Sequence, residues 1–107
     1  MGTNLIRGHL EGLLLAVLRQ SPGHGYALCE RLAARSGGTL VVPDGSLYPA
    51  LQRLERAGSV VSSWAVADGR RRRVYELTAT GRRQADGAAR EWRTFSTAVD
   101  AVLGDPA

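Results

Sequence analysis

Four consecutive arginines, Arg70 to Arg73, directly follow an Asp-Gly pair that lies between two β-prone runs. Asp-Gly in this context is a strong signal for a two-residue hairpin turn, so the arginines are expected at the tip of a β-hairpin. Adjacent like charges repel one another, and a hairpin tip does not need them in order to fold. A polyanion would relieve the repulsion as its condensed counterions are released. We therefore expect Arg70, Arg71 and Arg72 to contact phosphates and Arg73 to be partly structural, with a solubilising charge run as the alternative.

A helix predicted from Ser46 to Ala57 carries the second set of chemically suited residues. Leu47, Leu51 and Leu54 share one side of it and are expected to face a core. The opposite side is polar and basic, and its donors suit phosphates and base edges, since glutamine can pair with adenine and arginine with guanine. Residues in the first two turns would reach deepest into a groove. The candidate contacts are Ser46, Tyr48, Gln52 and Arg53, and a solvated helix face is the alternative.

The elements that position these two sets follow from the apolar pattern of the chain. Apolar residues recur at helical spacing or alternate at strand spacing between Gly-rich breaks. The expected helices are 4–20, 25–36, 46–57 and 79–103, and the expected strands are 60–67 and 71–77. This order is mainly α with a small β-hairpin, and it predicts a winged helix-turn-helix of three helices and a wing, followed by one long C-terminal dimerisation helix. In such a domain the third helix enters the major groove of DNA.

Capping residues support these boundaries. Ser46 is a suitable N-cap for the third helix, with Asp44 as the rival, and Gly58 ends that helix from the C′ position. Thr78 is expected to cap the last helix. We divide the chain into a DNA-binding part, residues 1–78, and a dimerisation helix, residues 79–107, within one structural unit.

Composition limits the classes of function. With 107 residues the chain is long enough for one small domain, and its 44% hydrophobic and 22% charged residues are typical of a folded protein. The net charge is +4, and all 14 basic residues are arginine. A basic domain of this size favours nucleic acid as a partner, ahead of an acidic protein or a membrane surface. The apolar stretch from Gly12 to Leu18 is too short to span a bilayer.

Catalytic and metal-binding patterns are missing from the sequence. We find no Ser-His-Asp arrangement, phosphate-binding glycine loop or carboxylate pair, and His9, His24 and Cys29 match no recognised metal-ligand spacing. We therefore expect no enzyme activity, no cofactor and no metal. The single cysteine excludes an intrachain disulfide and fits a reducing cytoplasm.

The second predicted helix is expected to turn Tyr26, Cys29, Leu32 and Ala33 toward the core. A cysteine on such a side behaves as a small hydrophobe. A redox-sensing thiol is the alternative for Cys29.

The last helix carries a heptad-like apolar seam with little core left to cover. The seam consists of Ala85, Ala88 or Ala89, Trp92, Phe95 or Ser96, Val99, and Val102 or Leu103. Pairing with a second copy of the chain would bury it, so we predict a homodimer.

Several short motifs occur together along the chain. They are Gly45-Ser46-Leu47-Tyr48-Pro49-Ala50-Leu51, Arg53-Leu54-Glu55 and Gly58, then His24-Gly25-Tyr26, Trp64, Arg73-Val74-Tyr75-Glu76-Leu77-Thr78 and Gly81. In this combination the chain resembles PadR-type transcriptional regulators, from Leu10 to about Leu103. Val74 departs from the family pattern, in which an aromatic or basic residue is common at that position.

The resemblance implies a cytoplasmic bacterial repressor that binds an inverted-repeat operator as a homodimer. Members of the family often control efflux or detoxification genes and release DNA when a small molecule binds. Tyr48 matches the tyrosine of the family's recognition helix, and the tip arginines replace a basic wing that varies. In PadR-like proteins the last helix packs on the partner's first and last helices, and the small members lack a further C-terminal domain.

The resemblance also implies a candidate site for an inducer. In some small PadR-like proteins a tryptophan of the last helix meets its symmetry mate across the dimer axis, and flat aromatic drugs stack between the two. The corresponding pocket or interface residues here are Leu14, Ala88, Ala89, Trp92, Phe95 and Val99. A tryptophan that only fills the dimer interface is the alternative, because aromatic residues are common at interfaces.

We predict from these patterns a homodimeric repressor that binds double-stranded DNA. The alternative is a winged-helix module that binds another protein and no DNA. An RNA-binding winged helix ranks third, because the single tyrosine of the third helix offers few platforms for base stacking. Retention of a promoter fragment in a gel shift separates the first hypothesis from the second.

Overall fold

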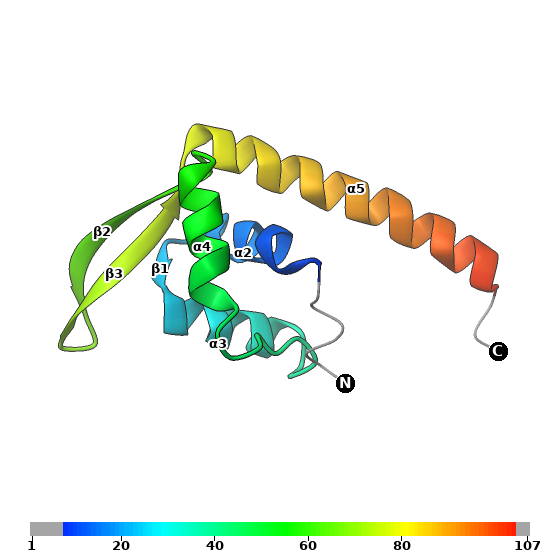
Figure 1. The fold of residues 1–107 in the computed structure, drawn as a ribbon. Coiled ribbons are helices and arrows are strands. Elements are labelled where there is room, and N and C mark those ends of the chain that lie inside the picture. Colours follow the sequence, from blue (N-terminus) through cyan, green and yellow to red (C-terminus); the bar gives the residue numbers. More distant parts are fainter. Residues whose placement is uncertain (1–7, 105–107) are drawn as a thin grey trace.

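The computed structural model describes residues 8–104 and arranges them as helices with a small antiparallel sheet at one side (Figure 1). The helices are α2 (Leu10–Leu18), α3 (Gly25–Arg35), α4 (Leu47–Arg56) and α5 (Ala79–Leu103), and the strands are β1 (Gly23–His24), β2 (Val60–Ala67) and β3 (Arg70–Leu77). This is the predicted winged helix-turn-helix with a long C-terminal helix. The third and last helices and both long strands lie within one residue of their expected bounds.

The hairpin of β2 and β3 forms the wing, and its turn has the predicted chemistry. Asp68 and Gly69 both have positive φ, at 54° and 72°, which a two-residue turn matching the strand twist requires. The strands pair from Val60↔Leu77 to Ala67↔Arg70. The two-residue β1 adds to the other edge of β3, giving the order β1-β3-β2. A strand of two residues is too short to leave a periodic signal, so the sequence did not predict it.

The core lies where α2, α3 and α4 meet the base of the wing. Leu14, Leu28 and Leu51, one from each helix, are completely buried. Tyr75 and Leu77 of β3 close the core on the sheet side, and Ala85 of α5 also belongs to it.

Two helices differ from the sequence prediction. The first begins at Leu10 rather than Asn4, because Gly8 has a φ of +80°, outside the helical region; residues 4–7 of the predicted helix lie outside the described part of the chain. On α3, the expectation that Tyr26 faces the core was wrong, since 63% of it is exposed. The buried side of α3 consists of Gly25, Leu28 and Leu32, spaced by three and four residues, which turns Tyr26 outward.

The predicted N-cap of α4 is partly correct, and the predicted glycine at its C-terminal end is confirmed. Ser46 holds the N-cap position, but its side chain makes no capping hydrogen bond. At the other end Gly58 has a φ of +77°. The backbone N–H of Ser59 donates to the Leu54 carbonyl and that of Gly58 to the Glu55 carbonyl, at 2.9 and 3.0 Å. These two bonds form a Schellman motif, which directs the chain from α4 into β2.

The wing and α5 leave the core from one junction. Thr78 caps α5 as predicted, because its Oγ1 accepts a hydrogen bond from the Gly81 N–H at 3.0 Å. The same hydroxyl donates to the Gly58 carbonyl at 2.6 Å. Gly81 packs so closely that a Cβ there would lie 2.0 Å from the Ser59 carbonyl oxygen. From this junction α5 runs along the molecule and then extends well past the other helices (Figure 1).

Candidate nucleic-acid interface

The exposed side of α4 carries the residues expected to contact DNA. Its buried side consists of Ala50, Leu51 and Leu54, which hold the helix against the core. The opposite side exposes 56% of Tyr48 together with Gln52, Arg53 and Arg56, while Ser46 is half-buried.

Arg53 already has a partner within the chain. Its Nε donates to the Glu11 carboxylate of α2, and both side chains are about half exposed. The ion pair crosses from the first helix to the exposed side of α4, a contact between residues far apart in sequence that the sequence prediction missed. It makes Arg53 less available to a ligand than Gln52 or Tyr48.

The four wing arginines are divided between the two faces of the hairpin. Because side chains alternate along a strand, Arg71 and Arg73 share one face and Arg70 and Arg72 the other. The guanidinium carbons of Arg71 and Arg73 lie 5.0 and 5.4 Å from the ring centroid of Trp64 on the neighbouring strand. These are cation–π distances, so Trp64 is a platform that holds two of the four charges in place.

Arg73 also connects the wing to α4, in agreement with a partly structural role. Its Nε donates to the Ser62 hydroxyl at 2.9 Å, and that hydroxyl donates to the Glu55 carboxylate of α4 at 2.8 Å. Beside this chain, burial raises the pKa of Tyr75, and the negative charge of Glu55 raises it further while Arg73 opposes the shift. Tyr75 is therefore a neutral phenol at neutral pH and adds no negative charge to the surface.

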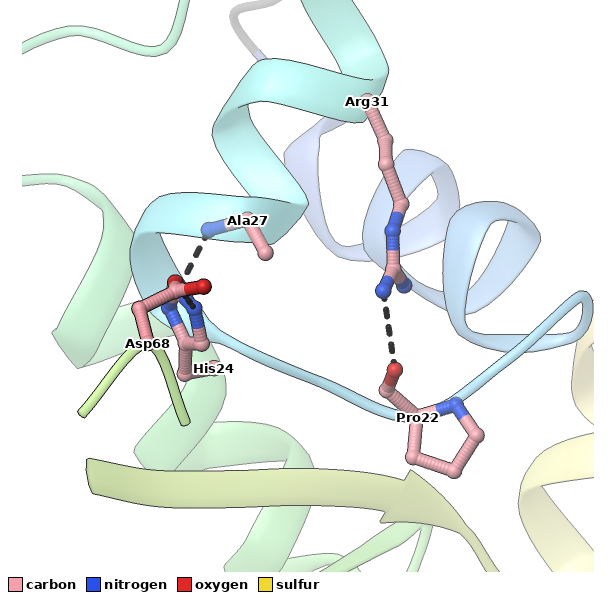
Figure 2. Close-up of polar contacts among 5 residues, drawn as sticks. All are labelled: Pro22, His24, Ala27, Arg31 and Asp68. Carbon is pink, nitrogen blue, oxygen red and sulfur yellow. Dashed lines mark hydrogen bonds and ion pairs between the residues drawn. The ribbon is translucent and has the colours of Figure 1, made fainter. Parts of the chain in front are cut away.

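His24 faces the wing tip from the start of α3 (Figure 2). Its Nδ1 accepts a hydrogen bond from the Ala27 N–H at 3.3 Å and so caps the helix. Its Nε2 lies 3.5 Å from an Asp68 carboxylate oxygen at the hairpin turn. Because Nδ1 is used as an acceptor, the proton of the neutral ring is on Nε2, which makes that atom a donor.

The loop that leads into β1 is held by Arg31. Its two terminal nitrogens donate to the carbonyls of Ser21 and Pro22, each at 2.9 Å, and Figure 2 includes the second of these contacts. These two hydrogen bonds hold the loop that precedes His24 against α3. His24 was not among the predicted site residues, because histidine is not one of the usual N-cap residues.

A pocket of about 400 Å³ joins the wing to the N-terminal turn of α4. It is lined by His24, Gly25, Tyr48, Trp64, Arg71, Arg72, Arg73 and Tyr75. Of the residues predicted to contact DNA, the pocket brings together Tyr48, Arg71 and Arg72, while Ser46, Gln52, Arg53 and Arg70 are not in its lining. Trp64, Arg73 and His24 were not predicted as site residues. The two-residue turn fixes the position of Trp64 opposite Arg73, so that part of the site was available from the sequence.

Comparison with known proteins identifies the family. Residues 14–86 match the family model described as "Transcriptional regulator PadR-like family". This protein belongs to that family. A PadR-like transcriptional regulator from Bacillus cereus has a solved structure with a TM-score of 0.81 and 27% identity, covering 95% of this chain and 98% of that one. The transcriptional regulator Rv3488 of Mycobacterium tuberculosis is 49% identical over 59 residues, which are 55% of this chain and 52% of that protein.

A second solved relative has a similar fold. The structure of a PadR family transcriptional regulator from Eggerthella lenta has a TM-score of 0.76 and 32% identity, covering 94% of this chain and 86% of that one.

The far half of α5 in this PadR-like regulator exposes large apolar side chains. Trp92 and Phe95 are 54% and 59% exposed, and Val102 and Leu103 are exposed as well. The Trp92 ring packs edge-on against His9, with 5.6 Å between centroids. Ala88, Ala89 and Val99 are half-buried.

Leu14 was wrongly included among the pocket or interface residues of this helix. It is completely buried in the core of its own chain, so it cannot line an exposed surface beside Trp92. The apolar spacing of α2 identified Leu14 as an inward residue but could not say which neighbour would cover it.

The described part of this PadR-like regulator gives little support to redox sensing by Cys29 or to metal binding. Cys29 is half-buried, and burial raises the pKa of its thiol, which disfavours the reactive thiolate. Within residues 8–104, no three His, Cys, Asp or Glu side chains form a group that could hold a metal ion. Over the same residues, no helix has both the length and the apolar character needed to cross a bilayer.

Proposed function

We propose that this protein is a transcriptional repressor that binds double-stranded DNA as a homodimer at an inverted-repeat operator. The observation that carries the proposal is the shared pocket: Tyr48 of α4 and Arg71 to Arg73 of the wing line the same space. The predicted recognition helix and the arginine-rich wing therefore belong to one continuous surface. That surface suits a duplex, with α4 in the major groove and the wing on the neighbouring backbone.

The proposed contacts fall into two groups. On α4, Ser46, Tyr48 and Gln52 face the base edges, and Arg53 joins them when it exchanges Glu11 for a phosphate or a base. On the wing, Arg70, Arg71 and Arg72 neutralise phosphates. The DNA-binding part comprises residues 1–78. A protein with this role works in the bacterial cytoplasm, where the chromosome is.

The homodimer forms through residues 79–107. The exposed apolar side chains of α5 lose contact with water when a second copy packs against them, and this burial favours association. A two-fold axis through this interface places the two α4 helices about one turn of DNA, or about 34 Å, apart.

An inducer acts at the same dimer interface. Trp92 and Phe95, with Ala88, Ala89 and Val99 beside them, offer aromatic faces and small side chains that suit a flat aromatic molecule. Binding there would change the spacing of the two α4 helices and release the operator.

Binding of the DNA segment upstream of the protein's own gene, measured against salt concentration, tests the DNA-binding proposal. The logarithm of the binding constant should fall with the logarithm of salt concentration with a slope of about −0.9 for each phosphate contacted. A variant with Arg70, Arg71 and Arg72 changed to Gln should bind weakly and with a shallower slope. A matched control changes Arg82, Arg83 and Arg90 of α5 to Gln, which removes the same three charges outside the wing and α4.

Two outcomes would contradict the proposal. One is a salt-independent affinity at a specific site, because phosphate contacts always release counterions. The other is a gel shift in which neither the wild type nor the wing variant retains a promoter fragment, while the wing variant still performs the wild-type function in the cell. That outcome would favour the protein-binding alternative.

A further inference from the structure

A chain of polar contacts runs from α4 into the wing. The Glu55 carboxylate of α4 accepts a hydrogen bond from the Ser62 hydroxyl at 2.8 Å, and the same hydroxyl accepts one from the Arg73 Nε at 2.9 Å. A hydroxyl has one hydrogen to donate and lone pairs to accept, so Ser62 makes both bonds at once. Glu55 and Ser62 are half-buried, which shields this link between α4 and Arg73 from water.

The chain of contacts lies at the level where the wing leaves the core. Tyr75, which pairs with Ser62, is buried, whereas the side chains of residues 63–66 are exposed. The short strand β1 pairs with β3 at this same level, and beyond it β2 and β3 continue outward to the hairpin turn (Figure 1). Near the turn, His24 and Asp68 are 3.5 Å apart, which is longer than an ordinary hydrogen bond. The outer wing therefore depends on polar links from its base.

Arg73 extends this support along the outer wing. Its guanidinium carbon lies 5.4 Å from the centroid of the Trp64 ring, and that of Arg71 lies 5.0 Å from the same ring. Two like charges beside one indole repel each other, so they stay together only if one of them is held. Ser62 and Glu55 hold Arg73. Arg71, which forms no ion pair within residues 8–104, then has a fixed ring to pack against.

We propose that Glu55, Ser62 and Arg73 are positioning residues for DNA binding, which fix the Trp64 ring, and with it Arg71, relative to α4. The inference rests on the proposed DNA binding and assigns the groups that orient the wing. A duplex presents its major groove and the adjacent backbone at a fixed spacing, so α4 and the wing bind together only if their own spacing matches. Side chains that are already held also lose less entropy on binding.

Substitutions at Ser62 test this chain of contacts without changing any charge. Threonine and valine have nearly the same shape, but only threonine keeps the hydroxyl. Ser62→Thr should bind the DNA segment upstream of the protein's own gene within about twofold of the wild type. Ser62→Val should bind about fivefold more weakly at about 0.15 M salt, with a salt slope shallower by about 0.9, which is the effect of one lost phosphate contact. Both variants keep every arginine.

Ser63→Val is the control for the substitution itself. Ser63 is exposed, and its side chain lies on the opposite face of β2 from Ser62. This variant should keep the affinity and the salt slope of the wild type, and all three serine variants should unfold near the wild-type temperature. Equal affinities and slopes for Ser62→Thr and Ser62→Val would overturn the proposal, because the hydroxyl would then position nothing.

A double-mutant cycle shows whether Ser62 acts through Arg71. If it does, Ser62→Val should cause no further loss of affinity in an Arg71→Gln protein, because the side chain that it positions is already gone. Two losses that simply multiply would mean that the residues act independently, and the proposal would be wrong.

Glu55 provides a test that does not depend on the folding of the Ser62 variants. Removal of a negative charge near DNA should strengthen binding, as we expect for Glu76→Gln, an exposed position on the other face of β3. Glu55→Gln should instead weaken binding about twofold or more, because a neutral acceptor holds Ser62 and Arg73 less firmly. If Glu55→Gln strengthens binding as much as Glu76→Gln does, the positioning role is refuted while DNA binding stands. If the wild type retains no duplex, the proposed function itself fails.

Discussion

Two segments extend from the same small core, and they differ in the side chains that they expose. The wing extends as two fully paired strands, with four arginines at the tip end of β3. The far half of α5 extends as a single helix that exposes Trp92, Phe95, Val102 and Leu103. Both leave from the junction of Gly58, Thr78 and Gly81.

The difference indicates which of the two segments is stable in a single chain and which needs a partner to cover it. Guanidinium groups are permanently charged and do not need to be covered by a partner, so the wing is stable in water alone and its charge is available to a polyanion. Exposed apolar surface costs about 25 cal/mol per Å² relative to burial, so the far half of α5 is stabilised when a second copy covers it. The wing also exposes Val61, Trp64 and Val66, but it alone carries a run of four arginines, so the two extensions favour different partners.

The largest expected effect comes from the junction itself. Gly81→Ala should destabilise the protein by about 3 kcal/mol, because the new Cβ would meet the backbone oxygen of Ser59 at 2.0 Å and the backbone must move. Gly87→Ala is the control on the same helix, where the nearest atom is the Arg90 Nη2 at 4.0 Å. It should stabilise the protein by up to about 1 kcal/mol, since alanine favours a helix over glycine.

Chemical denaturation of both variants measures these changes. A Gly81→Ala protein as stable as the wild type would contradict the tight junction and, with it, the common origin of the two extensions.

The next effect concerns the apolar extension alone. Changing Trp92 and Phe95 together to Ala should weaken the homodimer by at least about 2 kcal/mol, or about 30-fold in the dissociation constant, because large aromatic side chains dominate such interfaces. Sedimentation equilibrium gives the constant. The control changes Thr94 and Thr97 to Ala, on the other side of α5, and should leave the constant unchanged. Equal constants for the two double variants would place the dimer interface elsewhere.

Local signals in the sequence predicted much of the fold. The Asp-Gly turn fixed the register of the wing, Thr78 and Gly58 marked helix ends, and apolar spacing placed α4 with its polar side outward. These features depend on residues close together in sequence. The same signals placed Tyr48 and the tip arginines among the candidate contacts.

Contacts between distant residues were the part that the sequence could not supply. The ion pair of Arg53 with Glu11 and the approach of Asp68 to His24 depend on how separate elements pack. The core-facing side of α3 was misjudged for the same reason, because Tyr26 is apolar enough to be buried but lies on the wrong side once Gly25 packs against α4. Burial of Leu14 beneath its own chain, rather than at a dimer interface, is a further case.

The smallest expected effect sharpens the comparison from the side of the wing. Arg70 is exposed and follows the hairpin turn in a run of four like charges, so it contributes repulsion rather than packing. Arg70→Gln should leave the free energy of unfolding within about 0.5 kcal/mol of the wild type, with any gain confined to low salt, where the repulsion is unscreened. Thermal unfolding at low and high salt measures both quantities. A loss of more than about 1 kcal/mol would mean that the arginines hold the wing together, and the wing would then be no more independent of a partner than the far half of α5.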